Sequence, residues 1–164
     1  MFSSFAVPLG RFLAVTTIAI WAASAAAEPA GPFAGLDGVW SGRGQIHLSD
    51  GRRESLRCRA TYQVDADAKA MHQVLRCASD SSNFELRSDV ESQGDRISGN
   101  WSELTRSLAG KLSGQARRGR IDVRVQGDVF NAEVILVSVG DRQTVTISSP
   151  GSQISGVAIT LRRG

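Results

Sequence analysis

Residues 56–64 read LRCRATYQV and residues 71–77 read MHQVLRC, and these two stretches decide the fold. In both, residues suited to a buried face alternate with polar ones at a period of two, which is typical of a half-buried β-strand. If the two strands form a hairpin, Cys58 lies directly opposite Cys77. Opposed residues in an antiparallel pair have Cα atoms roughly 4.5 to 5.5 Å apart, a separation that a disulfide tolerates. Alternation and cysteine position therefore predict the same register, with one cross-strand disulfide.

The same period of two continues along the chain and predicts ten short strands. They are expected at about 40–48, 56–64, 70–79, 84–91, 96–103, 111–117, 120–126, 130–139, 143–148 and 155–163. Most joins carry Gly, Asp, Asn or Ser and are short enough for hairpins, but the join at 103–110 is longer and is expected to hold a helical turn or a flap. Even spacing and hairpin joins predict an all-β, antiparallel up-and-down barrel, because closure removes exposed edges.

The first 27 residues differ in composition from the rest. Arg11 is their only charged residue, and an apolar run at 12–21 is followed by small residues up to Ala27. This order is typical of a cleavable signal peptide, and the run is shorter than the roughly 20 residues that a membrane anchor needs. We expect a signal peptide at 1–27, an irregular lead-in at 28–36 and one barrel domain at 37–164. The mature protein is then periplasmic or secreted, with no integral membrane segment.

Charge and cysteine content bound the function. The chain has 19 basic and 16 acidic residues, so removal of the signal peptide with Arg11 leaves 18 and 16, a net charge of +2. Along the sequence the arginines alternate with acids and polar residues, which predicts no nucleic acid and no other polyanionic partner. Both cysteines lie in the exported part, as expected for a disulfide formed in an oxidising compartment.

A short signature links the two ends of the predicted barrel. Gly38-Val39-Trp40, together with Arg162 and Arg163, resembles the signature of the calycins, the superfamily of lipocalins, fatty-acid-binding proteins and avidins. In that superfamily a Trp of the first strand packs against an Arg of the last, so the resemblance implies that Trp40 and Arg162 close the barrel. A guanidinium over an indole gains roughly 0.5 to 2 kcal/mol as a cation–π contact.

Two further resemblances cover longer parts of the chain. Residues 40–44 are similar to the opening of nitrobindin-type barrels, which bind haem through a His late in the chain; His47 and His72 come early, so we expect no haem and no other cofactor. Segments including 58–62 and 76–80 resemble exported alphaproteobacterial proteins of unknown function. That resemblance implies export, a β fold and the disulfide, and it supplies no activity.

Chemistry-bearing side chains are sparse. His47 and His72 fall outside any inward cluster of carboxylates, and we interpret both as surface residues. The loop acids Asp65, Asp67 and Asp80 lack the EF-hand pattern and are interpreted as turn formers, so no metal site is expected. No nucleophile and base can be assembled from two such histidines, which predicts that the chain is not an enzyme. The basic segment 117–120 could hold a phosphate or carboxylate, but we interpret it as a solvated turn.

The predicted interior is the most informative set of residues. Its large members are Trp40, Leu56, Tyr62, Met71, Leu75, Phe84, Leu86, Trp101, Leu112, Val123, Phe130, Leu136, Ile147 and Leu161, interleaved with glycines, alanines and Ser88. Small inward residues either let the barrel close fully or leave a hollow, because ten strands can enclose a ligand. The sequence leaves both open, with a packed core slightly favoured.

Two functions follow, of different kinds. The first is an exported calycin-like barrel that binds a small apolar or amphipathic ligand inside; Tyr62 and Gln73 are candidates for orienting the ligand's polar end, with Trp40 and Trp101 beside them. The alternative is that Tyr62 and Gln73 have a structural role and form a hydrogen bond with each other. The second is a module or inhibitor that binds an envelope or secreted protein, because residues 134–139 are apolar on both faces. Their outer face must be covered by the lead-in around Phe33 and Leu36 or by a partner.

Overall fold

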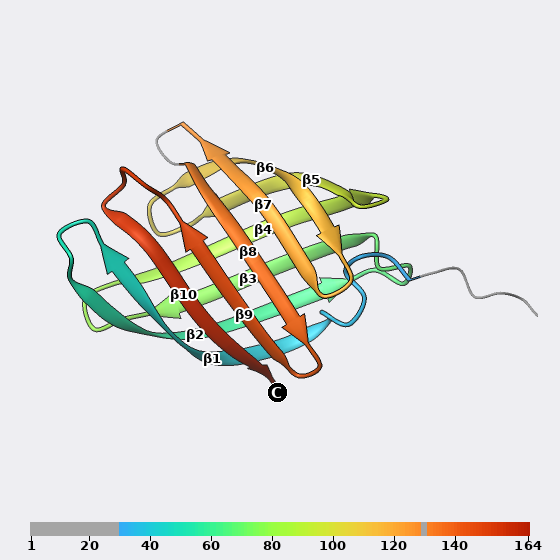
Figure 1. Cartoon of the computed structure of the whole chain (residues 1–164), viewed down its shortest axis with the longest axis horizontal. Coiled ribbons are helices and arrows are strands. Elements are labelled where there is room, and N and C mark those ends of the chain that lie inside the picture. The colour runs from blue at the N-terminus through green and yellow to red at the C-terminus, as the bar shows by residue number, and fades with distance from the viewer. Residues whose placement is uncertain (1–29, 129–130) are drawn as a thin grey trace, which may run out of the picture.

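A computed structural model describes residues 30–128 and 131–164, which form a closed barrel of ten antiparallel strands (Figure 1). The predicted signal peptide and Phe130 lie outside the described residues. The strands are β1 (Gly38–Leu48), β2 (Arg53–Val64), β3 (Ala70–Ala78), β4 (Asn83–Gln93), β5 (Arg96–Glu103), β6 (Leu108–Arg117), β7 (Arg120–Gly127), β8 (Asn131–Val139), β9 (Arg142–Ser148) and β10 (Ile154–Arg163). Each pairs with its neighbours in sequence and β10 pairs with β1. The predicted up-and-down barrel is confirmed.

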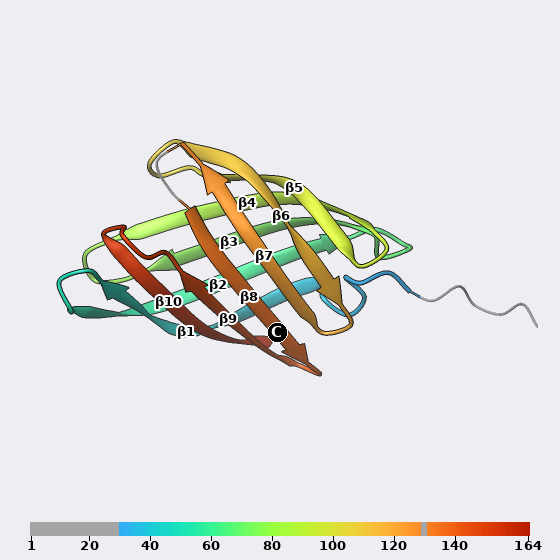
Figure 2. The ribbon, with the colours of Figure 1, turned by 45° about the horizontal axis from the view of Figure 1, so that its top comes forward.

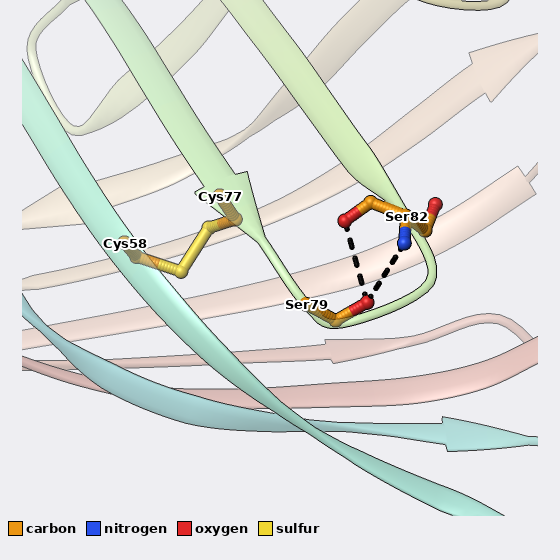
Figure 3. Close-up of a disulfide and its surroundings, with 4 residues drawn as sticks. All are labelled: Cys58, Cys77, Ser79 and Ser82. Atoms are coloured by element: carbon orange, nitrogen blue, oxygen red, sulfur yellow. Dashed lines mark hydrogen bonds between the residues drawn. A yellow bond between two sulfur atoms is a disulfide. The ribbon is translucent and has the colours of Figure 1, made fainter.

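The hairpin of β2 and β3 has the predicted register. Cys58 faces Cys77 and Tyr62 faces Gln73 across the two strands. The two cysteines form a disulfide with a Cα–Cα distance of 4.2 Å, just before the turn that joins β3 to β4 (Figure 3). The disulfide is buried in the barrel interior, where it ties two strands that already pair.

The barrel has two ends that differ in construction. One, which we call the Trp40 end, carries residues 30–37, the turns β2–β3, β4–β5, β6–β7 and β8–β9, and the C-terminus. The other, the Phe84 end, carries the turns β1–β2, β3–β4, β5–β6 and β9–β10. In Figure 1 the lead-in lies at the right with the β2–β3 turn, and the β1–β2 and β3–β4 turns lie at the left. Figure 2 shows the same strands wrapping around one interior.

The lead-in packs into the Trp40 end. Phe33 is fully buried and Leu36 is 3% exposed, and both belong to the core cluster. The indole Nε1 of Trp40 donates a hydrogen bond of 2.8 Å to the Leu36 carbonyl, while the backbone N–H of Phe33 donates to Ala68 of the β2–β3 turn. The lead-in is therefore a plug held by side-chain burial and by backbone hydrogen bonds.

Arg163, rather than the predicted Arg162, packs on Trp40. Its guanidinium carbon lies 4.3 Å from the Trp40 ring centroid, and its nitrogens donate to lead-in carbonyls. The antiparallel register explains the difference, since Trp40 faces Arg163 and Ser41 faces Arg162. Alternation then turns Arg162 outward, where it lies 3.8 Å from Asp141.

Of the two covers considered for the outer face of β8, the lead-in or a partner, the lead-in is excluded. Phe33 and Leu36 enter the barrel end instead, because burying them against Trp40 removes more apolar surface from water than a convex outer wall would. On the outer face, Ile135 stays 38% exposed and Val139 stays 74% exposed.

Two inward glycines allow the seam between β1 and β10 to close. A Cβ added to Gly42 would lie 2.0 Å from the Thr160 carbonyl oxygen, and one added to Gly44 would lie 2.3 Å from that of Ala158. These small residues admit the backbone of the neighbouring strand, so they serve closure and not a hollow.

The join at 103–110 is shorter than predicted. It is a turn at 104–107, and β6 begins at Leu108. The carboxylate of Glu103 accepts the backbone N–H groups of Thr105 (3.0 Å) and Arg106 (2.7 Å), which holds the chain in a tight turn where no helical turn or flap forms.

Loss of the disulfide is expected to lower stability without changing the fold. The bridge joins residues 19 apart in sequence, and the loop-entropy model gives such a crosslink about 3 kcal/mol. Urea unfolding of a Cys58→Ser/Cys77→Ser variant, compared with wild-type protein whose disulfide is intact, measures the change. An unchanged midpoint would show that the crosslink does not stabilise the barrel.

Candidate functional site

The inner wall near the Phe84 end is reached by solvent. Several apolar residues that face inward by alternation are only partly buried: Phe84, Leu86, Leu108, Val123, Val125, Val134 and Ile147. In a closed, fully packed barrel such side chains would lie among others at close-packed density and lose nearly all their exposure. We interpret them as the wall of an apolar cup that opens at the Phe84 end.

Three residues of this wall form a continuous row. Val123 faces Val134 across β7 and β8, and Val134 faces Ile147 across β8 and β9. On the other side of Val123 stands Gly114 of β6, which adds no side chain to the interior. Toward the Trp40 end, by contrast, Ala116 and Leu161 are completely buried. The cup therefore has a packed floor and a more open upper wall.

Gln73 and Ser88 are the polar groups on the opposite wall. They face each other across β3 and β4, and the Ser88 hydroxyl donates a hydrogen bond of 3.0 Å to the Gln73 side-chain oxygen. Gln73 is half-buried, and among the described residues its amide nitrogen has no hydrogen-bond partner. Trp101 faces Ser88 from β5, is 7% exposed, and donates its indole N–H to the Gln126 carbonyl at 3.1 Å.

Tyr62 belongs to the Trp40 end, and its partner is Gln143 instead of Gln73. The phenol donates a hydrogen bond of 2.7 Å to the Gln143 side-chain oxygen, and the Gln143 amide donates to the Ser138 hydroxyl at 3.1 Å. Burial raises the pKa of the Tyr62 phenol well above its usual range, and the hydrogen bond to Gln143 offsets only part of that effect. With its polar atoms engaged and 1% of its surface exposed, Tyr62 is structural.

Sequence reasoning thus placed two of four candidates at the cup. Gln73 and Trp101 lie on its wall, whereas Tyr62 and Trp40 lie in the floor and plug. Gln143 was missed because its partner is 81 residues away, although it shares the inward face of β9 with Val145 and Ile147.

Polar side chains surround the mouth of the cup. A shallow groove of about 460 Å³ lies between the turns 79–82 and 104–107. At its side the Glu54 carboxylate accepts hydrogen bonds from the hydroxyls of Ser81 (2.6 Å) and Ser79 (2.7 Å), which lower its pKa. Figure 3 shows Ser79 in this turn, where its hydroxyl contacts Ser82.

Glu103 is a buried carboxylate at this rim. Its side chain is 7% exposed, and burial alone raises its pKa. Hydrogen bonds from the backbone and hydroxyl of Thr105 and from the backbone of Arg106 and Glu85 outweigh burial, so the net pKa lies below the ordinary 4.5. Glu103 is ionised at neutral pH and organises the turn.

A second, smaller cavity lies at the Trp40 end. It has a volume of about 270 Å³ between the lead-in and strands β7 and β8, with Ile121 and Leu136 in its wall and Arg118 at its edge. This is below the roughly 300 to 1,000 Å³ of typical small-molecule sites. In the adjoining basic segment Arg120 pairs with Asp122 at 2.6 Å.

The histidines lie apart from the cup. His72 points outward, and its Nδ1 is 2.7 Å from an Asp89 carboxylate oxygen. His47 is on the outer face of β1, as the alternation predicts. Across residues 30–128 and 131–164, no three side chains of His, Cys, Asp or Glu converge as metal ligands would.

Comparisons with known proteins identify the fold and no family. No protein-family model matches the chain, and no curated protein matches it significantly. The S-type phycobiliprotein lyase of Guillardia theta has a similar structure, with a TM-score of 0.51 and 14% identity over 78% of this chain and 88% of the lyase. At this identity the likeness concerns the barrel fold alone. The similarity to exported alphaproteobacterial proteins stays a prediction. In the described part of the chain, no helix is long and apolar enough to cross a membrane.

The prediction that the chain is not an enzyme is corrected by this comparison. That prediction rested on the architecture and on the lack of a familiar catalytic arrangement. A barrel of the same architecture is, by its name, a lyase. The fold therefore gives no ground for excluding catalysis, and function has to be argued from the site.

Replacement of Glu103 by Gln is expected to remove a stabilising contribution that depends on pH. Because the folded pKa is below 4.5, the carboxylate stabilises the fold above its ordinary pKa, and this stabilisation is lost as the pH falls through the lowered folded value. Losing charge-assisted hydrogen bonds costs roughly 1 to 3 kcal/mol. Thermal unfolding between neutral and acid pH is expected to show a gap between wild type and variant that narrows in acid.

The matched control is Glu91→Gln, which changes an exposed carboxylate on the outer face of β4. If Glu103→Gln and Glu91→Gln shift the melting temperature equally at every pH, the buried carboxylate does not organise the turn.

Proposed function

We propose that this protein binds a small, mostly apolar molecule in the cup that opens at the Phe84 end. The observation that carries the proposal is the row of Val123, Val134 and Ile147, which face inward and yet stay partly exposed. A ligand that covers this exposed apolar wall binds more tightly, because burying apolar surface is favourable by roughly 25 cal/mol per Å².

A polar contact orients the bound molecule. The free amide N–H groups of Gln73 can donate to a carbonyl, carboxylate or hydroxyl oxygen of a ligand, while Ser88 holds the Gln73 side-chain oxygen. The ligand is therefore amphipathic, with an apolar body against β7 to β9 and an acceptor oxygen toward β3. Trp101 faces Ser88 from β5 and supports this wall.

The fold neighbour supports a role in handling a small molecule, since its name describes a lyase for phycobiliproteins. A cup of this kind serves a bound substrate as well as a carried ligand. Export is part of the proposal: residues 1–27 have the composition of a signal peptide, and the Cys58–Cys77 disulfide is typical of an oxidising compartment. The same reasoning supports a periplasmic or secreted location.

Filling the cup is expected to weaken ligand binding. Val134→Phe extends a side chain into the interior, so the affinity for the fluorescent probe 8-anilinonaphthalene-1-sulfonate is expected to fall by roughly tenfold, about 1.4 kcal/mol. Titration of the purified protein with the probe, followed by its emission, measures this change, and native mass spectrometry shows whether a ligand co-purifies.

Ile135→Phe is the matched control, because it makes a comparable change at the next residue of β8 on the outer face. Its probe affinity is expected to equal that of wild type. Equal loss in both variants, or loss only in Ile135→Phe, would place the bound probe outside the barrel and overturn the proposal.

A further inference from the structure

Arginines gather on one side of the outer wall. Strands β9, β10, β1, β2 and β3 are neighbours around the barrel (Figure 1), and the only acidic residue within them is Glu54, on the inward face. Their outward positions carry seven arginines: Arg43, Arg53, Arg57, Arg59, Arg76, Arg142 and Arg162. We call this wall the arginine face.

The sequence prediction of no polyanionic partner overlooked this face. Arg57 and Arg59 are separated by one residue, and in a strand that spacing puts both on the same side. Asp141 lies 3.8 Å from Arg162 at the edge of this face, whereas other acids lie elsewhere on the barrel, among them Glu85, Asp89 and Glu91 on β4. The small net charge of the chain therefore combines one strongly basic side of the barrel with another side that carries both acidic and basic residues.

The arrangement places like charges opposite one another. Arg43 faces Arg57 across β1 and β2, and Arg59 faces Arg76 across β2 and β3. Such cross-strand pairs are destabilising. Arg76 is compensated by Glu85 on β4, at 2.8 Å. In the described part of the chain, Arg43, Arg57 and Arg59 have no ion-pair partner.

Protection of a sheet edge does not account for these charges. Charged residues often line exposed edge strands, where they prevent pairing with another chain. In this barrel β1 pairs with β10 and β2, and β2 pairs with β1 and β3, so neither strand is an edge. The uncompensated arginines stand in the middle of a continuous sheet.

We infer that the arginine face binds a linear acidic polysaccharide. Guanidinium groups recognise carboxylates and sulfates through paired N–H donors. Between the arginines stand exposed hydroxyl and amide side chains, including Ser41, Gln45 and Ser55, which suit sugar hydroxyls. A flexible chain can follow the convex wall from strand to strand.

The same face suits other polyanions less well. Single-stranded nucleic acid is bound by basic grooves with aromatic platforms, and Trp40 and Tyr62 of these strands point inward. Peripheral membrane binding combines basic residues with inserted apolar side chains. The large apolar side chains exposed among the described residues are Leu104, Ile135 and Val139; only Val139 lies opposite an arginine of the arginine face, Arg142, and one valine is a small apolar anchor.

Polysaccharide affinity tests this inference directly. Full-length protein is titrated with alginate and with heparin at about 0.15 M salt, where charges more than roughly 8 Å apart are screened. Wild type is expected to bind both. Arg43→Gln/Arg57→Gln/Arg59→Gln is expected to lose at least about tenfold in affinity. Its melting temperature is expected not to fall, because the substitutions relieve like-charge opposition.

Arg96→Gln/Arg117→Gln/Arg124→Gln removes the same charge from other strands and is expected to bind as wild type does. If both triple variants lose the same affinity for the polysaccharides, binding depends on net charge alone and the inference is overturned. Tighter binding to phosphatidylglycerol vesicles or to single-stranded DNA than to both polysaccharides would also overturn it. Binding of the uncharged apolar probe N-phenyl-1-naphthylamine is expected to be unchanged in both triple variants, because this probe has no anion to pair with arginine, so this test is independent of the cup.

Discussion

The pairing of β1 with β10 is the contact on which the rest of the structure depends. It runs from Trp40 opposite Arg163 to Leu48 opposite Ile154, and it turns a ten-stranded sheet into a barrel with an inside and an outside. Gly42 and Gly44 make the approach of the two backbones possible. Once the sheet is closed, alternation assigns each strand residue to the interior or to solvent. The plug, the cup and the arginine face all follow from that assignment.

Most of the fold could be predicted from the sequence because its rule is local. A period of two marks each strand, short polar joins mark the hairpins, and the cysteines give an independent check on the register of β2 and β3. Three parts could not be predicted in this way. The register between β1 and β10 decides whether Arg162 or Arg163 contacts Trp40, and no cysteine pair in these two strands indicates that register. The path of the lead-in depends on where burial is available, and the Tyr62–Gln143 bond joins strands far apart in sequence.

The candidate site was predicted in part for the same reason. Alternation places Gln73 and Trp101 inside, but it cannot say whether an inward residue meets another side chain or a hollow. That depends on how side-chain volumes add up across the barrel, so Val134 is partly exposed while Leu136, two residues later on the same face, is buried. Likewise, arginines spaced along several strands come together only when those strands are placed side by side.

The inside and the outside of this barrel therefore offer separate surfaces. The proposed cup is apolar with one polar contact, and Phe33 and Leu36 are buried at the Trp40 end, away from its mouth. The arginine face is polar and lies on the outer side of β9, β10, β1, β2 and β3. Under the two proposals, a ligand held inside and a polymer held outside do not compete for the same surface.

Methyl NMR with a nitroxide-labelled fatty acid tests the central claim, that a ligand occupies the interior at the Phe84 end. The account predicts that the label broadens methyl signals of Val123, Val134 and Ile147 and leaves those of Leu36 and Leu161 sharp. Broadening confined to Ile135 and Val139 on the outer face would contradict it.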